Sequence, residues 1–155
     1  MKRIACILLL LAIGFMSANA QSTAKQKAFR QGIVNYLNEE GFKASIDEDE
    51  DIIFKKEGSN YWITIASEEP YYVEMNVAGF GIKDADLLAC LQACNYANVN
   101  KRCGKACLSE DSIDFTVEFY CGSVAAFKDT FYRNIGALDI IKKTTRERYS
   151  ELVDD

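Results

Sequence analysis

The stretch FKASIDEDEDIIFKKEGSNYWITIA, residues 42–66, decides the fold, because short apolar runs in it alternate with turn signals. Two strands are predicted, at 42–47 and 51–57, and the acidic turn 48–50 joins them. Gly58-Ser59-Asn60 then leads into a third strand rich in aromatic and β-branched residues. The stretch therefore predicts a meander of three antiparallel strands.

A helix is predicted before this meander and a further strand after it. Phe29, Ile33 and Leu37 recur every four residues, which is typical of an amphipathic helix over 24–40. The segment 71–78 is predicted as a fourth strand.

The second half of the chain repeats the theme of a helix followed by a hairpin. A helix over 84–98 is followed by predicted strands at 103–108 and 113–121, joined by an acidic turn. Asn35-Tyr36 precedes the first hairpin at a distance similar to that of Asn95-Tyr96 before the second. An α-β-β unit is thus predicted to occur twice.

A last long helix is predicted after Gly122-Ser123, with a buried stripe at three-four spacing. The whole order predicts one α+β domain over residues 21–145, with helices packed on an antiparallel sheet, and a frayed acidic tail over 146–155. The expected core comprises Phe29, Ile33, Leu37, Phe54, Ile63, Leu91, Phe115, Val117, Phe127, Phe131 and Leu138.

The first twenty residues have the three parts of a secretory signal peptide. The charged pair Lys2-Arg3 precedes an apolar run over 4–16, and Ala18-Asn19-Ala20 forms an A-x-A cleavage site. That run is too short to span a bilayer, which takes about 20 apolar residues. We therefore expect a mature chain that begins at Gln21, is periplasmic or secreted, and does not insert into the membrane after cleavage.

Charge and composition restrict the function classes. Removal of Lys2 and Arg3 lowers the basic count from 18 to 16 against 23 acidic residues, a net charge of −7, which disfavours nucleic acid and anionic membranes. The chain contains no histidine, which excludes serine triads and histidine zinc sites. With no nucleophile elbow, P-loop or dinucleotide turn, we expect no enzyme and no cofactor. An enzyme built on carboxylates ranks last among the functions considered.

Several short strings carry a resemblance to a known family. They are YLNEEGF at 36–42, DIIFK at 51–55 and ACNYAN at 93–98, and over about residues 28–140 the chain resembles the YbjN family. The resemblance implies an α+β fold like that of type III secretion chaperones and a role in binding protein. Members of the family are usually cytoplasmic and poor in cysteine, so the signal peptide and five mature cysteines are departures.

The five mature cysteines are the most specific chemistry in the chain. Cys90 and Cys94 are predicted to share a helix face, and Cys103 and Cys107 a strand face. If the helix reverses near residue 100, Cys94 comes level with Cys103 and Cys90 roughly level with Cys107. In an exported chain this predicts disulfides Cys94–Cys103 and Cys90–Cys107, with Cys121 unpaired or intermolecular.

Two other interpretations of these cysteines stay open. The four paired residues could hold zinc as thiolates, although their C-x3-C spacing differs from the usual C-x2-C knuckle. They could also be small reduced residues of the core.

The acidic string over 47–51 imitates the first half of a calcium loop. The pattern fails at the sixth position, where Ile52 replaces the required glycine, and at the twelfth, where Gly58 replaces a carboxylate. The string is therefore predicted to be a solvated hairpin turn.

Four aromatic residues offer a candidate binding surface: Tyr61, Trp62, Tyr71 and Tyr72. Strands favour such residues for packing as well, so both roles stay open. The leading prediction is an exported, non-catalytic protein-binding module, chaperone-like or regulatory, with an unknown protein partner and with a homodimer left open. The alternative is a periplasmic small-molecule or metal binder that uses the cysteine or aromatic cluster.

Overall fold

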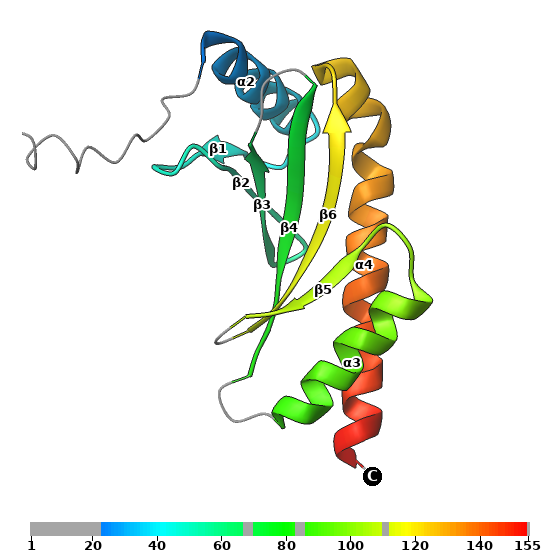
Figure 1. The fold of residues 1–155 in the computed structure, drawn as a ribbon. Coiled ribbons are helices and arrows are strands. Elements are labelled where there is room, and N and C mark those ends of the chain that lie inside the picture. Colours follow the sequence, from blue (N-terminus) through cyan, green and yellow to red (C-terminus); the bar gives the residue numbers. More distant parts are fainter. Residues whose placement is uncertain (1–22, 67–69, 83–85, 110–111, 155) are drawn as a thin grey trace, which may run out of the picture.

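A computed structural model describes residues 23–66, 70–82, 86–109 and 112–154 (Figure 1). These residues form helices packed on an antiparallel sheet, so the predicted α+β class and order of elements are confirmed. The predicted signal peptide lies outside the described residues. The elements are α2 (Ala24–Glu39), β1 (Ser45–Ile46), β2 (Ile52–Lys56), β3 (Ser59–Ile65), β4 (Tyr71–Gly81), α3 (Leu87–Asn100), β5 (Lys105–Leu108), β6 (Ser112–Cys121) and α4 (Val124–Asp154).

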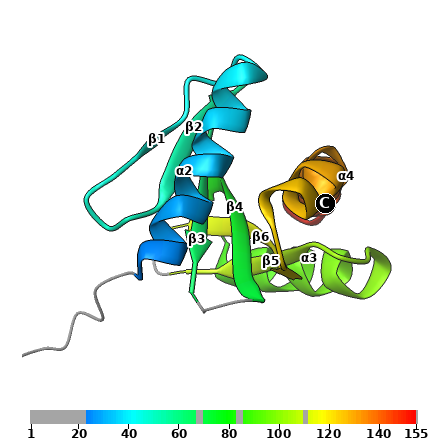
Figure 2. The ribbon, with the colours of Figure 1, turned by 90° about the horizontal axis from the view of Figure 1, so that it is seen from above.

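The strands form one sheet in the order β1-β2-β3-β4-β6-β5, so the second hairpin joins the meander through β4 and β6. α2 and α4 cover one face of this sheet and touch each other through Tyr36, which packs edge-on against Phe127 and Phe131 (Figures 1 and 2). α3 lies along β5 and beside the second half of α4. Within the described ranges, no helix lies on the opposite face of the sheet (Figure 2).

The turn between β2 and β3 is one residue earlier than the sequence predicted. Glu57 and Gly58 form it with φ of 50° and 80°, and Lys56 pairs with Ser59 across it. Two positive φ values are typical of a primed two-residue turn, whose twist matches that of the strands. Gly58 is therefore the second central residue of the turn.

The core matches the predicted core except at one residue, Leu91, which is 48% exposed. α3 buries the opposite face, which carries small side chains that allow close approach to α4 and β5. Those small residues are Ala89, Cys90, Ala93, Cys94 and Ala97.

α3 also begins later than predicted. Asp86 caps it, with its carboxylate accepting from the backbone N–H of Leu88 at 2.8 Å. The predicted start, Asp84, lies outside the described residues.

The duplicated α-β-β unit is visible in two equivalent asparagines. Asn38, near the end of α2, donates to the carbonyl of Ala44, and Asn98, near the end of α3, bonds the backbone of Ala106. Each unit then carries a residue with positive φ two places before its strand, Lys43 in the first and Cys103 in the second. The Asn-Tyr-x-Asn string therefore joins each helix to the strand that follows.

The prediction of a frayed tail is wrong for residues 146–154, which continue α4. Tyr149 packs against Phe80 with ring centroids 5.5 Å apart, and the Arg146 guanidinium lies 5.9 Å from the same ring. These contacts hold the last turns against the end of β4. Among the helices of the described residues, none combines the length and apolar character needed to cross a membrane.

Candidate functional site

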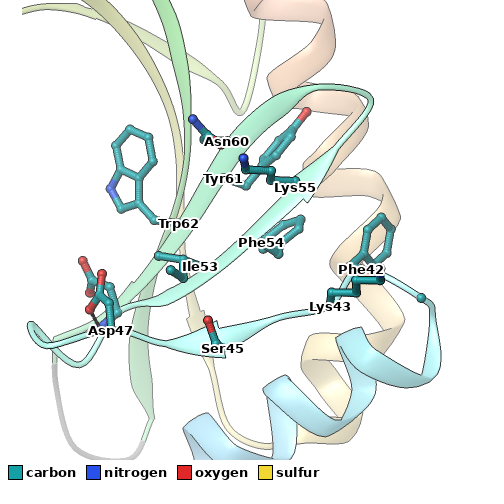
Figure 3. A pocket seen from close by; sticks show the side chains of 12 residues that line it. Phe42, Lys43, Ser45, Asp47, Ile53, Phe54, Lys55, Asn60, Tyr61 and Trp62 are labelled. Atoms are coloured by element: carbon teal, nitrogen blue, oxygen red, sulfur yellow. Dashed lines mark hydrogen bonds between the residues drawn. The ribbon is translucent and has the colours of Figure 1, made fainter.

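A groove opens beside β2, where β1 stops pairing with it (Figure 3). It has a volume of about 660 Å³, within the usual range for ligand sites. Its lining residues are Gly41, Phe42, Lys43, Ser45, Asp47, Asp51, Ile53, Phe54, Lys55, Asn60, Tyr61 and Trp62.

The groove exists because β1 is short. Strand pairing covers Ser45 and Ile46 alone, whereas the sequence predicted a strand over 42–47. Gly41 and Lys43 have φ of 91° and 51°, left-handed values that turn the chain away from β2. Beyond Ile53, the edge of β2 therefore has no strand beside it in the described structure.

The open edge presents the backbone of Lys55. The backbone carbonyl of Asp51 accepts a hydrogen bond from the N–H of Asp47, and Ile53 pairs with Ser45. Alternate residues on this side of the hairpin therefore point their backbone groups toward β1. Lys55 is next in this alternation, and it is exposed. Its N–H and C=O thus point into the groove from an unpaired edge.

Aromatic rings form the floor of the groove. Phe54 stacks on Tyr61 with centroids 5.1 Å apart, and Phe42 meets Phe54 edge-on at 5.5 Å (Figure 3). The Tyr61 hydroxyl donates to Asp139 of α4 at 3.2 Å. Burial, and then the negative charge of Asp139, raise the pKa of Tyr61, so it stays a neutral donor.

Trp62 stands at one side of the groove, on the face of the sheet without helices. With the Asn76 amide oxygen turned toward it, Nε1 of Trp62 donates to Asn76 at 3.2 Å. Asn76 in turn donates to Glu74 at 3.1 Å and to Thr116 at 3.0 Å. This polar network fixes the indole ring, which is the sole tryptophan of the chain.

Charge differs along the groove. Lys43 and Lys55 lie toward the end where β1 has turned away, whereas Asp47 lies at the acidic turn (Figure 3). Asp51 lies there too, because its N–H donates to the Asp47 carboxylate. Burial, offset by a hydrogen bond from Thr64, raises the pKa of Asp51, and the neighbouring Asp47 adds to the rise.

The acidic turn is ordered by hydrogen bonds within it and by Arg30 of α2. Asp47 accepts from the N–H groups of Asp49 and Asp51 at 3.0 and 2.9 Å, an arrangement typical of an Asx turn. Arg30 forms an ion pair with Glu50 at 3.3 Å and donates to the Ile65 carbonyl at 3.0 Å. The Asp47 carboxylate therefore forms its hydrogen bonds with the backbone of its own turn.

The predicted aromatic surface is divided between the two faces of the sheet, because neighbouring residues of a strand point in opposite directions. Trp62 and Tyr72 lie on the face without helices, while Tyr61 and Tyr71 are buried on the other. Tyr71 stacks on Phe29 at 4.1 Å. Trp62 and Tyr61 both reach the groove, one from each face of β3, whereas Tyr71 and Tyr72 do not line it.

Neither predicted disulfide is formed in the structure, where all five described cysteines are free thiols. Cys103 precedes β5 in a left-handed turn and does not share a strand face with Cys107. Cys103 and Cys107 are exposed, whereas Cys90 and Cys94 lie on the buried face of α3. The prediction that Cys103 and Cys107 share a strand face is therefore wrong, because Cys103 lies before β5 begins.

Burial has a marked effect on the thiols. It raises the pKa of Cys94 to about 11 and also raises the pKa values of Cys90 and Cys107. Cys121 is buried at the end of β6, and its Sγ donates to the Ser123 carbonyl at 3.2 Å. Within the described part of the chain, no cluster of three or more cysteine or carboxylate side chains is placed to hold a metal ion.

Comparisons of the chain with family models, with curated proteins and with solved structures find no match. The open backbone edge, aromatic floor and charged ends of the groove are suited to binding an extended chain.

Proposed function

We propose that this protein is an exported, non-catalytic binding module that holds a short extended segment of a partner polypeptide in the groove beside β2. The observation that carries the proposal is that, among the described residues, no strand pairs with Lys55 on the β1 side of β2, in a groove that is also lined by the rings of Phe42, Phe54 and Tyr61. An exposed strand edge is a template for an added strand, with main-chain hydrogen bonds for affinity and side-chain pockets for specificity.

The partner segment takes the place that a longer β1 would occupy. The edge left free covers Phe54 to Lys56, a length of about 10 Å or three residues. Lys55 supplies the pairing groups, and Phe54 with Phe42 offers a surface to one apolar side chain of the partner. Lys43 favours a carboxylate next to that side chain.

Other features of the chain agree with a binding role. The sequence resembles the YbjN family, and this resemblance implies a role in binding protein. The chain also lacks histidine and recognised catalytic motifs. The signal peptide, still a prediction, puts the partner in the envelope or outside the cell.

A second candidate is a small apolar molecule in the same groove. The groove volume of about 660 Å³ and its rings, Phe42, Phe54 and Trp62, would also suit such a ligand. The two candidates differ in whether the Lys55 backbone takes part.

The test first selects peptide ligands and then removes one backbone donor, the N–H of Lys55. A phage library of 12-residue peptides is selected on the mature protein, and selected peptides are titrated while the emission of Trp62 is followed. We expect selected peptides to combine an aromatic or aliphatic residue with an adjacent carboxylate. Because Trp62 is the sole tryptophan and lines the groove, binding there should change its emission.

Two variants of one residue separate backbone pairing from charge. K55P removes the N–H that faces the groove, at an edge position where proline is tolerated. K55A removes the charge and keeps the N–H. K55P should weaken binding at least about 10-fold and K55A less than about 3-fold, with circular dichroism to verify that both variants fold.

Three outcomes would overturn the proposal. The first is a failure of the selection to return peptides that alter Trp62 emission. The second is equal affinity for wild type and K55P. The third is binding of a hydrophobic dye such as 8-anilinonaphthalene-1-sulfonate that K55P leaves unchanged, with peptides unable to compete, which would favour the small-molecule candidate.

A further inference from the structure

The outer face of α3 is uncharged and exposes several large apolar side chains, and nothing lies over it in the described structure. Leu88, Leu91 and Val99 are 62%, 48% and 75% exposed, and Leu87 is exposed as well. The fourteen residues of α3 include no aspartate, glutamate, lysine or arginine. Large apolar side chains gathered on an exposed, uncharged helix face are typical of an interface.

Four of the exposed residues form one stripe along the helix. Leu88, Leu91, Asn95 and Val99 are spaced by three, four and four residues, which places them on one side of the helix. The small residues that pack on α4 and β5 occupy the opposite side. The stripe therefore faces away from the protein along the length of the helix, about 21 Å.

Opposite charges stand at the two ends of the stripe. Asp86, at the start of α3, is exposed, and Lys101 with Arg102 follows its end. A second copy of α3 packed antiparallel would bring each acidic end to a basic end. If Leu88 of one copy lies opposite Val99 of the other, the numbering places Asp86 opposite Lys101.

A hollow beside the stripe can accept a side chain from the second copy. It has a volume of about 350 Å³ and is lined by Gln92, Asn95, Tyr96, Val99, Asn100 and Arg148. Arg148 of α4 lies over the Tyr96 ring at 5.4 Å and closes its side. In the antiparallel arrangement, the leucines at the start of the other α3 lie next to this hollow.

We propose that two copies of this protein associate through α3 as a two-fold symmetric, antiparallel pair. In such a dimer the same surface is used twice, so one stripe with opposite charges at its ends is self-complementary. A single helix pair with its flanks buries on the order of 600–800 Å² per copy, at the lower end of stable interfaces. The dimer should accordingly dissociate in the micromolar range.

The test is sedimentation velocity of the mature protein from 1 to 200 µM, with reductant to prevent disulfide-linked species. Wild type should shift from monomer to dimer over this range. L88E should raise the dissociation constant at least about 30-fold, because it places a charge against the apolar side chain of Val99 in the other copy. I140E is the matched control, since Ile140 is 54% exposed on α4 and outside the stripe.

A charge reversal tests the antiparallel arrangement. K101E places a carboxylate opposite Asp86 and should weaken the dimer at least about 10-fold. K43E makes the same change of charge far from α3 and should leave the dimer unchanged. K55P should also leave it unchanged, so this inference can fail or succeed independently of the proposed function.

Wild type that stays monomeric at 200 µM would overturn the inference. A dimer that L88E leaves intact would do so too, because its interface would then lie elsewhere. Equal effects of K101E and K43E would exclude the antiparallel arrangement. A chain that stays monomeric while α3 binds another protein would also overturn the inference, because the face would then serve a different partner.

Discussion

The side-chain amide of Asn98 forms hydrogen bonds to both backbone groups of Ala106. Its Oδ1 accepts from the Ala106 N–H at 2.7 Å, and its Nδ2 donates to the Ala106 carbonyl at 3.0 Å. β5 is the edge strand of the sheet, so this amide acts as the next strand would. A single side chain thus covers the edge at Ala106 and joins α3 to β5.

Replacement of Asn98 by alanine should therefore destabilise the protein. N98A leaves two partly buried backbone groups without these partners, and we expect the free energy of unfolding to fall by about 2 kcal/mol. N100A is the matched control, because Asn100 makes one exposed hydrogen bond, to the Tyr96 carbonyl. Urea unfolding at 1 µM would measure both, and equal losses would contradict the role of Asn98.

Arg30 should matter more than the glutamate with which it pairs. R30M keeps the aliphatic stem but removes the donor to the Ile65 carbonyl, and should cost about 2 kcal/mol. E50Q should cost less than about 1 kcal/mol, because Glu50 is partly exposed and its ion pair is screened by solvent. Thermal unfolding of the two variants compares them, and a larger loss for E50Q would refute this ranking.

The small residues on the buried face of α3 should not tolerate replacement by larger ones. Ala97 is fully buried against its neighbours, so A97L should destabilise the protein by about 2–3 kcal/mol through overpacking. L91A, on the exposed side of the same helix, should change the free energy of unfolding by less than about 0.5 kcal/mol in the monomer. If L91A proved the more damaging variant, the orientation of α3 would be wrong.

Stability should fall at alkaline pH because the buried thiols resist ionisation. Burial raises the pKa of Cys94 to about 11, whereas an unfolded cysteine ionises at about 8.5. The unfolded state therefore loses its proton first, so stability is full below about pH 8.5 and declines as the pH rises toward 11. Cys94 should account for about 1–2 kcal/mol of this decline.

The contribution of Cys94 can be isolated by substitution. C94A should lower stability at pH 7 slightly but lose less than wild type between pH 8.5 and 10.5. Urea unfolding in reductant at three pH values within this range gives both slopes. Parallel slopes would show that Cys94 ionises as readily in the folded state as in the unfolded one.

Export is predicted from the sequence alone and needs its own test. N-terminal sequencing of the protein from its native source should give Gln21 as the first residue. A cytoplasmic chain that retains Met1 would contradict export and, with it, the expectation of a partner in the envelope.

Much of the fold could be predicted because its periodicity is local. The stripe of α4 and the alternation around the β2–β3 turn identify those elements from sequence spacing alone. α3 is different, because apolar residues occur on all its sides, and spacing could not tell whether Leu91 or Cys90 is buried. Packing against α4 and β5 favours the small residues, which is a tertiary effect.

The site was harder to predict than the fold. Phe54 is predicted in the core, which is correct, and Tyr61 is predicted as one of four aromatic residues that could pack or bind. Both side chains are buried, and both also line the groove. The groove depends on the early end of β1, which follows from the left-handed backbone at Lys43. A non-glycine residue seldom adopts that conformation, so the sequence carries little signal for it. Gly41, just before, is the one local hint.

The most direct test of the central claim is the exchange of the Lys55 amide hydrogen with solvent, followed by NMR with and without a saturating selected peptide. Free protein should exchange this amide rapidly, because it faces an unpaired edge of β2. The proposed pairing predicts that bound peptide slows the exchange at least about 10-fold, while the amide of Lys43 changes far less. Unchanged exchange at Lys55 in the saturated complex would contradict strand addition at β2.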